Sequence, residues 1–193
     1  MKKLIAPFVF MSSFLFMQSA FSQVKKSTMS SGGTSPMEVG SVFVNAGFGV
    51  GADYKYSYGT GFGFKLSAEF GLWQAGPGVI TLGPEIGGSF SNGYNGFNSY
   101  DNYKSNTFIV AARSAWHYGW GVPSLDTYGG VSAGIGFNHY SYYYNNNYSS
   151  NQVIPAFGVF IGGSYFINPN FGFTAETGYD ITYFQVGVVF KIQ

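Results

Sequence analysis

A two-residue alternation of apolar and polar positions limits the fold of this chain more than any other feature. In GFGFKLSAEFGLW (residues 61–73) the even positions from Phe62 to Leu72 are apolar, while the odd ones are glycine, serine, Lys65, Glu69 and a final tryptophan. The segment TYFQVGVVFKIQ (182–193) repeats the pattern. Successive side chains of a β-strand point to opposite faces, so this period predicts strands with one apolar and one polar face.

The scarcity of charge indicates which solvent these strands meet. Charged residues are 9% of the chain, against roughly a quarter in soluble domains. The longest apolar segment after the N-terminus, VIPAFGVFIGGSYFI (153–167), is too short for a membrane helix and contains proline and glycine. A charge-poor chain rich in Gly, Phe and Tyr without helical spans predicts a membrane β-barrel, and a secreted β-sandwich is the alternative.

The N-terminus has the layout of an export signal. Lys2 and Lys3 precede a mostly apolar run over residues 4–17, and small residues follow. The run is too short to span a bilayer and is typical of a cleaved signal peptide. We expect a signal peptide over residues 1–22, a flexible periplasmic leader over 23–37 and a barrel domain over 38–193. Without the two lysines the formal net charge falls from +1 to −1, which argues against nucleic acid as a partner.

The connections between the predicted strands alternate in length. This alternation and an even strand count predict an all-β, eight-stranded antiparallel up-and-down transmembrane β-barrel, with short periplasmic turns and long outer loops. The expected strands are residues 40–51, 62–73, 79–90, 106–116, 125–138, 152–166, 171–179 and 183–192. The short connections are 74–78, 117–123 and 167–170, and the long ones are 52–61, 91–105 and 139–151. A short connection over 180–182 is the exception.

Three segments together resemble a known family. They are the export signal, the penultimate segment FGFTAETGYD (171–180) and the closing segment FQVGVVFKI (184–192). In these the chain resembles the small eight-stranded outer-membrane β-barrels of the OmpA and OmpX type, particularly the short outer membrane beta-barrel proteins of Bacteroidota. The resemblance implies a location in the bacterial outer membrane, contact with membrane lipid and lipopolysaccharide, and insertion by the barrel-assembly machinery.

Five charged side chains fall on the inward phase of the predicted strands. A Lys or Arg that faces lipid costs about 2–4 kcal/mol at the bilayer midplane, which favours inward positions. Because unpaired carboxylates would lose hydration there, we expect the cations to bridge three glutamates in a network that fills the lumen. The residues are Lys65, Glu69, Glu85, Arg113 and Glu176. An eight-stranded barrel is just wide enough for its own side chains, and a small porin-like channel is the alternative.

Tyrosine and asparagine dominate the predicted outer loops, as in NHYSYYYNNNYSSN (138–151). Aromatic faces with amide donors suit sugars, so the hypothesis is adhesion to a surface glycan or host ligand, against a purely structural role in the envelope. The expected loop contacts are Tyr94, Tyr100, Tyr103, Tyr142, Tyr143, Tyr144 and Tyr148. The tryptophans lie near the short turns, where they are expected to form an interfacial girdle of Trp73, Trp116 and Trp120.

A catalytic site has one candidate in the sequence. His139 and Ser141 resemble the His and Ser of the lipid A deacylase barrels and continue an outward strand phase, so a lipid A-modifying hydrolase is the less favoured alternative. The asparagine that follows the serine in that family is Tyr142 here, and no nearby acidic residue orients the histidine. His117 is expected to lie alone in a turn. With two histidines and no cysteine, we expect no metal site, no cofactor and no enzymatic activity.

Overall fold

The computed structural model describes residues 35–51, 61–94, 102–143 and 148–192, and all of its regular structure is β-strand. The predicted signal peptide and most of the predicted leader lie outside these residues. The strands are β1 (Val42–Val50), β2 (Gly61–Ala75), β3 (Gly78–Tyr94), β4 (Asn102–Tyr118), β5 (Leu125–Tyr143), β6 (Tyr148–Asn168), β7 (Phe171–Tyr179) and β8 (Phe184–Lys191).

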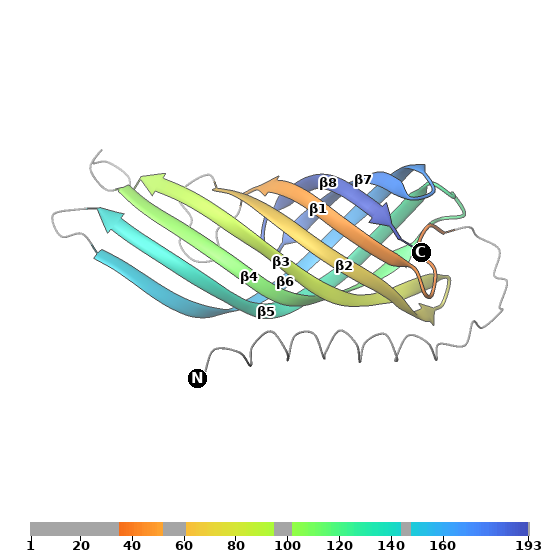
Figure 1. Cartoon of the computed structure of the whole chain (residues 1–193), viewed down its shortest axis with the longest axis horizontal. Helices are drawn as coiled ribbons and strands as arrows, with labels where there is room; N and C mark the ends of the chain where they lie inside the picture. Colours follow the sequence, from red (N-terminus) through yellow and green to blue (C-terminus); the bar gives the residue numbers. More distant parts are fainter. Residues whose placement is uncertain (1–34, 52–60, 95–101, 144–147, 193) are drawn as a thin grey trace, which may run out of the picture. The chain divides into compact units, whose positions relative to one another are not determined.

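The eight strands form a closed antiparallel ring in chain order (Figure 1). Each strand pairs with its neighbours in sequence, and β1 pairs with β8 from Phe43 opposite Lys191 to Val50 opposite Phe184. Where the short strands β1, β7 and β8 complete the ring, the sheet has no free edge. The backbone groups there are therefore hydrogen-bonded within the ring. The predicted eight-stranded up-and-down barrel is confirmed.

Burial alternates along the strands with the predicted phase. On β2 the odd residues from Gly61 to Gly71 are buried, whereas the even residues Phe62 and Leu66 are exposed. On β8 Gln185 and Val189 are buried, and the apolar residues between them point outward. On these two strands the face with the polar residues therefore lines the interior, and the apolar face forms the outer wall.

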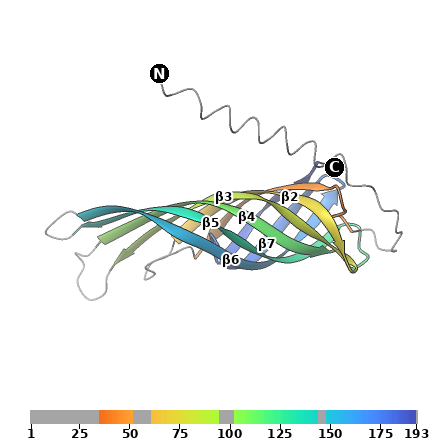
Figure 2. The ribbon, with the colours of Figure 1, turned by 90° about the horizontal axis from the view of Figure 1, so that it is seen from below.

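The strands extend further outward than the alternation predicted. Residues 91–105 and 139–151 were expected to be loops. Instead, β3 continues to Tyr94 and β4 begins at Asn102, while β5 continues to Tyr143 and β6 begins at Tyr148. Both views show the outer ends of β3 to β6 extending past β7 and β8 (Figures 1 and 2). The reason is that backbone pairing continues between Tyr- and Asn-rich segments in which the side-chain alternation has already ended.

A segment before β1 closes the end of the barrel where the short turns lie. Met37 is buried, and Lys191 Nζ donates a hydrogen bond of 2.7 Å to the carbonyl of Pro36. A Cβ at Gly71 would lie 2.2 Å from the Glu38 carbonyl oxygen, so glycine is required for this close approach. The described residues begin at Ser35, three positions before the expected start of the barrel domain at residue 38.

Within the described residues, no helix is long and apolar enough to cross a membrane.

Candidate functional site

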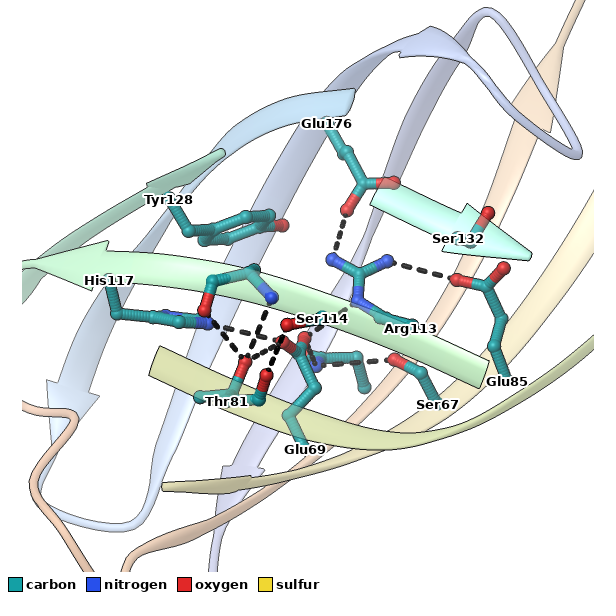
Figure 3. A network of polar contacts seen from close by, with 12 residues as sticks. Ser67, Glu69, Thr81, Glu85, Arg113, Ser114, His117, Tyr128, Ser132 and Glu176 are labelled. Atoms are coloured by element: carbon teal, nitrogen blue, oxygen red, sulfur yellow. Dashed lines mark hydrogen bonds and ion pairs between the residues drawn. The ribbon is translucent and has the colours of Figure 1, made fainter. Parts of the chain in front are cut away.

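Arg113 on β4 is the centre of a buried ion network inside the barrel. Its Nε donates to Glu69 Oε1 at 2.8 Å, its Nη1 to Glu85 Oε2 at 3.1 Å and its Nη2 to Glu176 Oε2 at 2.7 Å. Figure 3 shows the guanidinium between these carboxylates, which project from three other strands. One planar cation therefore ties β2, β3 and β7 to β4, using donors on all three of its nitrogens.

Lys65 on β2 is the second cation of the network. Its Nζ hydrogen-bonds Glu176, lies 3.6 Å from Glu85 Oε2 and donates to Asp180 Oδ2 at 2.8 Å. The structure thus brings together all five residues that the inward phase selected. Asp180 is an addition that the sequence did not suggest, because it belongs to the outer turn between β7 and β8. That turn folds into the lumen, where Ser132 Oγ also donates to Asp180.

His117 extends the network toward the end with the short turns, so its expected place alone in a turn was wrong. β4 runs on to Tyr118, which puts His117 on the inward phase four residues after Arg113. Its Nδ1 lies 2.7 Å from Asp126 Oδ2 and its Nε2 lies 3.1 Å from Glu69 Oε2. Carboxylates only accept hydrogen bonds, so this pair of partners favours the doubly protonated imidazolium.

Aromatic rings cover the cations on the remaining side. Arg113 Cζ lies 3.8 Å from the centroid of the Phe160 ring and 5.6 Å from that of Tyr128, and Lys65 Nζ lies 5.4 Å from the Phe160 centroid. The Tyr128 hydroxyl in turn hydrogen-bonds Thr174 at 2.9 Å. The ring faces supply a favourable electrostatic contact to both cations.

Carboxylates outnumber cations in this network. Glu69, Glu85, Asp126, Glu176 and Asp180 face two permanent cations and His117. Within the described part of the chain, Glu85 Oε1 and Asp126 Oδ1 are buried without a hydrogen-bond partner. The two carboxylates are therefore the least compensated members of the network, whereas both oxygens of Glu69 are engaged.

Clusters of buried apolar residues lie on both sides of the network. Toward the short turns lies a cluster of Met37, Phe43, Val79, Phe166 and Val189. Toward the outer end lies a second cluster of Ile109, Ala111, Ala156 and Ile181, the last of which comes from the turn after Asp180. The interior is thus packed at three successive levels, like the core of a small globular protein.

The three tryptophans of the predicted girdle lie near the short turns and are exposed. The Trp116 ring stacks on Tyr118, with centroids 5.6 Å apart, and its Nε1 donates to the carbonyl of Ala75. Trp120 Nε1 donates to Thr127 Oγ1 at 2.8 Å. The indole N–H groups of Trp116 and Trp120 are therefore held by the barrel while their rings are exposed.

Five of the seven predicted tyrosine contacts have a described backbone, at the end of the barrel opposite the short turns. Tyr100 and Tyr144 lie outside the described residues. The backbones of the other five belong to the extended strands, and their side chains lie outside what the structure describes; these are Tyr94, Tyr103, Tyr142, Tyr143 and Tyr148.

Below these tyrosines, a set of polar side chains occupies the outer wall of β4, β5 and β6. Lys104 pairs with Ser141 and Asn106 with His139 across β4 and β5, while Ser141 pairs with Ser149 and His139 with Asn151 across β5 and β6. We call these six residues the outer polar patch. All face away from the lumen.

Three members of the outer polar patch form a hydrogen-bonded chain. His139 Nδ1 lies 2.7 Å from Asn151 Oδ1, and Ser141 Oγ lies 3.2 Å from His139 Nε2. The amide oxygen of Asn151 can only accept, so Nδ1 carries a proton, and in the neutral ring Nε2 then accepts from the serine hydroxyl. His139 had no predicted partner, because it is the hairpin register that brings Asn151 opposite it.

The chain matches no known family model and no curated protein sequence. Solved structures similar to it include Ail, the attachment invasion locus protein of Yersinia pestis, at 17% identity and a TM-score of 0.39 over 80% of this chain and 96% of that one. Neisserial surface protein A is similar at 17% identity and a TM-score of 0.39, over 78% and 92%.

The N-terminal β-barrel domain of Pseudomonas aeruginosa OprF is similar at 17% identity and a TM-score of 0.38, over 79% of this chain and 97% of that one. Ail has also been solved in complex with the heparin analogue sucrose octasulfate. The ring of eight consecutive strand pairings gives this chain the up-and-down fold of the small outer-membrane β-barrels that its sequence resembles.

Proposed function

We propose that the protein is a closed barrel of the bacterial outer membrane that acts through its outer surface rather than through its lumen. The observation that carries this proposal is the filling of the interior at three levels, with the ion network of Arg113 and Lys65 between two apolar clusters. A solute would have to displace buried, mutually paired charges to pass. A structural role in the envelope and a role in surface contact both fit a closed lumen.

The outer wall supports the membrane location. From Val153 to Tyr165 the outward residues of β6 are apolar or aromatic apart from one glycine, and most are more than half exposed. At about 3.3 Å per residue this stretch is roughly 40 Å long, and a strand tilt of about 45° makes it roughly 28 Å along the membrane normal. That thickness fits a hydrocarbon core, so membrane lipid and the barrel-assembly machinery are the partners we propose.

The composition of the outer connections supports contact with uncharged sugars. Residues 139–151 carry no charge apart from one histidine, and residues 52–61 and 91–105 each carry one acidic and one basic side chain. Such connections cannot attract a polyanion strongly. Tyrosine rings and asparagine amides instead suit stacking and hydrogen bonding to neutral polysaccharide, which is the ligand class we propose.

A shortened hairpin tests the glycan proposal. Replacing residues 142–148 by Asn-Gly would join the paired Ser141 and Ser149 through a two-residue turn and would remove four of the tyrosines. We expect the variant to fold, as judged by heat-modifiable electrophoretic mobility, and to lose binding to neutral polysaccharides that the native protein retains on a glycan array. Unchanged glycan binding by the folded variant would contradict the proposal.

A small porin-like channel is the alternative function, and planar-bilayer conductance separates the two. We expect the refolded native protein to be silent. Steady channels that change with Glu85→Ala would instead show that the lumen is open.

A second candidate function, acyl-ester hydrolysis, is favoured by the hydrogen-bonded order of Ser141, His139 and Asn151. In that chemistry the serine hydroxyl gives its proton to His139 Nε2 as Oγ attacks an ester carbonyl, while Asn151 holds the ring in the required tautomer. Mass spectrometry of lipid A from cells with native protein, Ser141→Ala or no barrel tests it. Identical lipid A in all three would exclude hydrolysis.

A further inference from the structure

The outer wall changes from apolar to polar at the same register on three adjacent strands. Phe108, Phe137 and Val153 stand opposite one another on β4, β5 and β6. One pleat further out, the same three strands place Asn106, His139 and Asn151 opposite one another, and the next step brings Lys104, Ser141 and Ser149. The apolar row is exposed, as are most of the polar side chains. Each of the three strands therefore passes from apolar to polar outward residues within two positions, as expected where a strand crosses the plane between hydrocarbon and headgroups.

The outer polar patch offers hydrogen-bond donors at that plane. His139 Nδ1–H is directed to Asn151 Oδ1, which leaves Asn151 its amide N–H groups, and Asn106 brings a second amide. Lys104 adds three N–H donors and a positive charge one row further out. Because cross-strand pairing holds these groups on a rigid wall, they are arranged before any ligand arrives.

The charge of the outer polar patch favours an anion. Among the described residues, five of the six carboxylates are buried in the lumen, and the sixth, Glu38, lies at the opposite end beside Met37. Lys104 is therefore not opposed by a described carboxylate on this face of the wall. A phosphate would find a cation and amide donors here, with no repulsion from a carboxylate of the described residues.

The apolar row below the outer polar patch suits an acyl chain. The side chains of Phe108 and Phe137 are 45% and 47% exposed and that of Val153 is 68% exposed, so a lipid tail can lie directly against them. Polar donors above an apolar wall match a molecule with an anionic head and a hydrocarbon tail. A free anion would leave the apolar row without a role.

We propose that the outer polar patch is a binding site for the phosphate-bearing headgroup of an outer-leaflet lipid. This inference rests on the proposed membrane location and is independent of whether any bond is cleaved. Lys104 is the residue that selects the charge of the headgroup, Asn106 and Asn151 donate to its oxygens, and the row from Phe108 to Val153 receives the tail.

Native mass spectrometry of the barrel released from mixed vesicles tests the site. With equal amounts of phosphatidylglycerol and phosphatidylcholine, we expect the anionic lipid to be enriched about fivefold among bound lipids, the factor that one lysine near an anionic headgroup provides. Lys104→Gln keeps a polar side chain and should remove the enrichment, whereas Lys104→Arg should retain it. Excess inorganic phosphate should not compete, because it lacks the tail.

Each other outcome overturns the proposal at an identifiable point. Equal binding of the two lipids by the native barrel, or enrichment that survives Lys104→Gln, would remove the site while leaving the membrane location intact. Loss of the enrichment in excess phosphate would indicate a free-anion site in place of a lipid site. Failure of the barrel to insert, seen as absence of a heat-modifiable band, would overturn the membrane location and the lipid site together.

Discussion

The inner and outer faces of the same strands differ in both chemistry and exposure: the inner face carries buried ion pairs, and the outer face carries exposed apolar side chains. On β4 the inward residues Arg113 and His117 are almost completely buried and form ion pairs with carboxylates, while the outward residues Phe108 and Val110 are exposed. Consecutive residues of the strand thus alternate between the buried polar interior of the barrel and the exposed outer wall. From this difference we infer that the inner face determines the stability of the closed barrel, and that the outer face determines whether the barrel lies in lipid.

Removal of the central cation should have the largest effect on stability. Arg113→Ala leaves Glu69, Glu85 and Glu176 without their shared partner, and loss of one partner from a buried ionic cluster costs about 3–5 kcal/mol. Urea titration of the barrel in vesicles, followed by tryptophan fluorescence, measures this as a lower free energy of unfolding. Arg113→Lys is the matched control, and its free energy of unfolding should lie between those of the native protein and Arg113→Ala. Lysine keeps the positive charge but loses the planar arrangement of three nitrogens. Equal stability of Arg113→Ala and native protein would contradict a structural role for the network.

A charge on the outer face should cost somewhat less. Val159 lies midway along the apolar stretch of β6 and is 58% exposed. Val159→Arg should lower the free energy of unfolding from the bilayer by about 2–4 kcal/mol, since a cation at the midplane faces hydrocarbon. Val159→Leu is the control and should be nearly neutral. A small effect of the arginine would mean that this wall does not face lipid, and the comparison between the two faces would fail.

Truncation of the residue that closes the end of the barrel should have an intermediate effect. Met37→Ala removes a buried side chain from contact with Phe43 and Phe166 and should cost about 2 kcal/mol. The same variant should remain silent in planar bilayers, because the ion network still blocks the lumen. Channels opened by Met37→Ala would assign closure to the apolar cluster alone.

The sequence predicted the ring of strands and most of the charged residues in the lumen, because both follow from the alternation of apolar and polar residues along each strand. Lys65, Glu69 and Arg113 lie inside because their strand neighbours at odd and even positions differ in polarity, a rule that needs no tertiary information. His117 obeys the same phase, and it was missed only because the strand was expected to end at Trp116. Asp126 also stands on the inward phase of its predicted strand.

Other parts of the site could not have been read from the phase. Asp180 and Ile181 belong to a turn, and whether a turn folds into the lumen or away from it depends on the space that the closed ring leaves. The pairing of His139 with Asn151 depends on hairpin register across twelve residues, which the tyrosine- and asparagine-rich sequence does not fix because both of its faces are similar.

The smallest effect should distinguish two carboxylates that share one cation. Glu69 uses both oxygens, with Arg113 and His117 among its partners, whereas Glu85 Oε1 has none within the described residues. Replacing each by glutamine keeps the shape and removes the negative charge. Glu69→Gln should lower the free energy of unfolding by about 2 kcal/mol, as expected for lost hydrogen bonds to charged groups.

Glu85→Gln should cost less than about 1 kcal/mol, because it relieves an interior with more carboxylates than cations and gives the unpartnered position a donor. The same urea titration measures both variants. If Glu85→Gln lowered the free energy of unfolding as much as Glu69→Gln, the excess of carboxylates would not be destabilising. Groups other than Lys65, Arg113 and His117 would then have to balance the charge of the inner face.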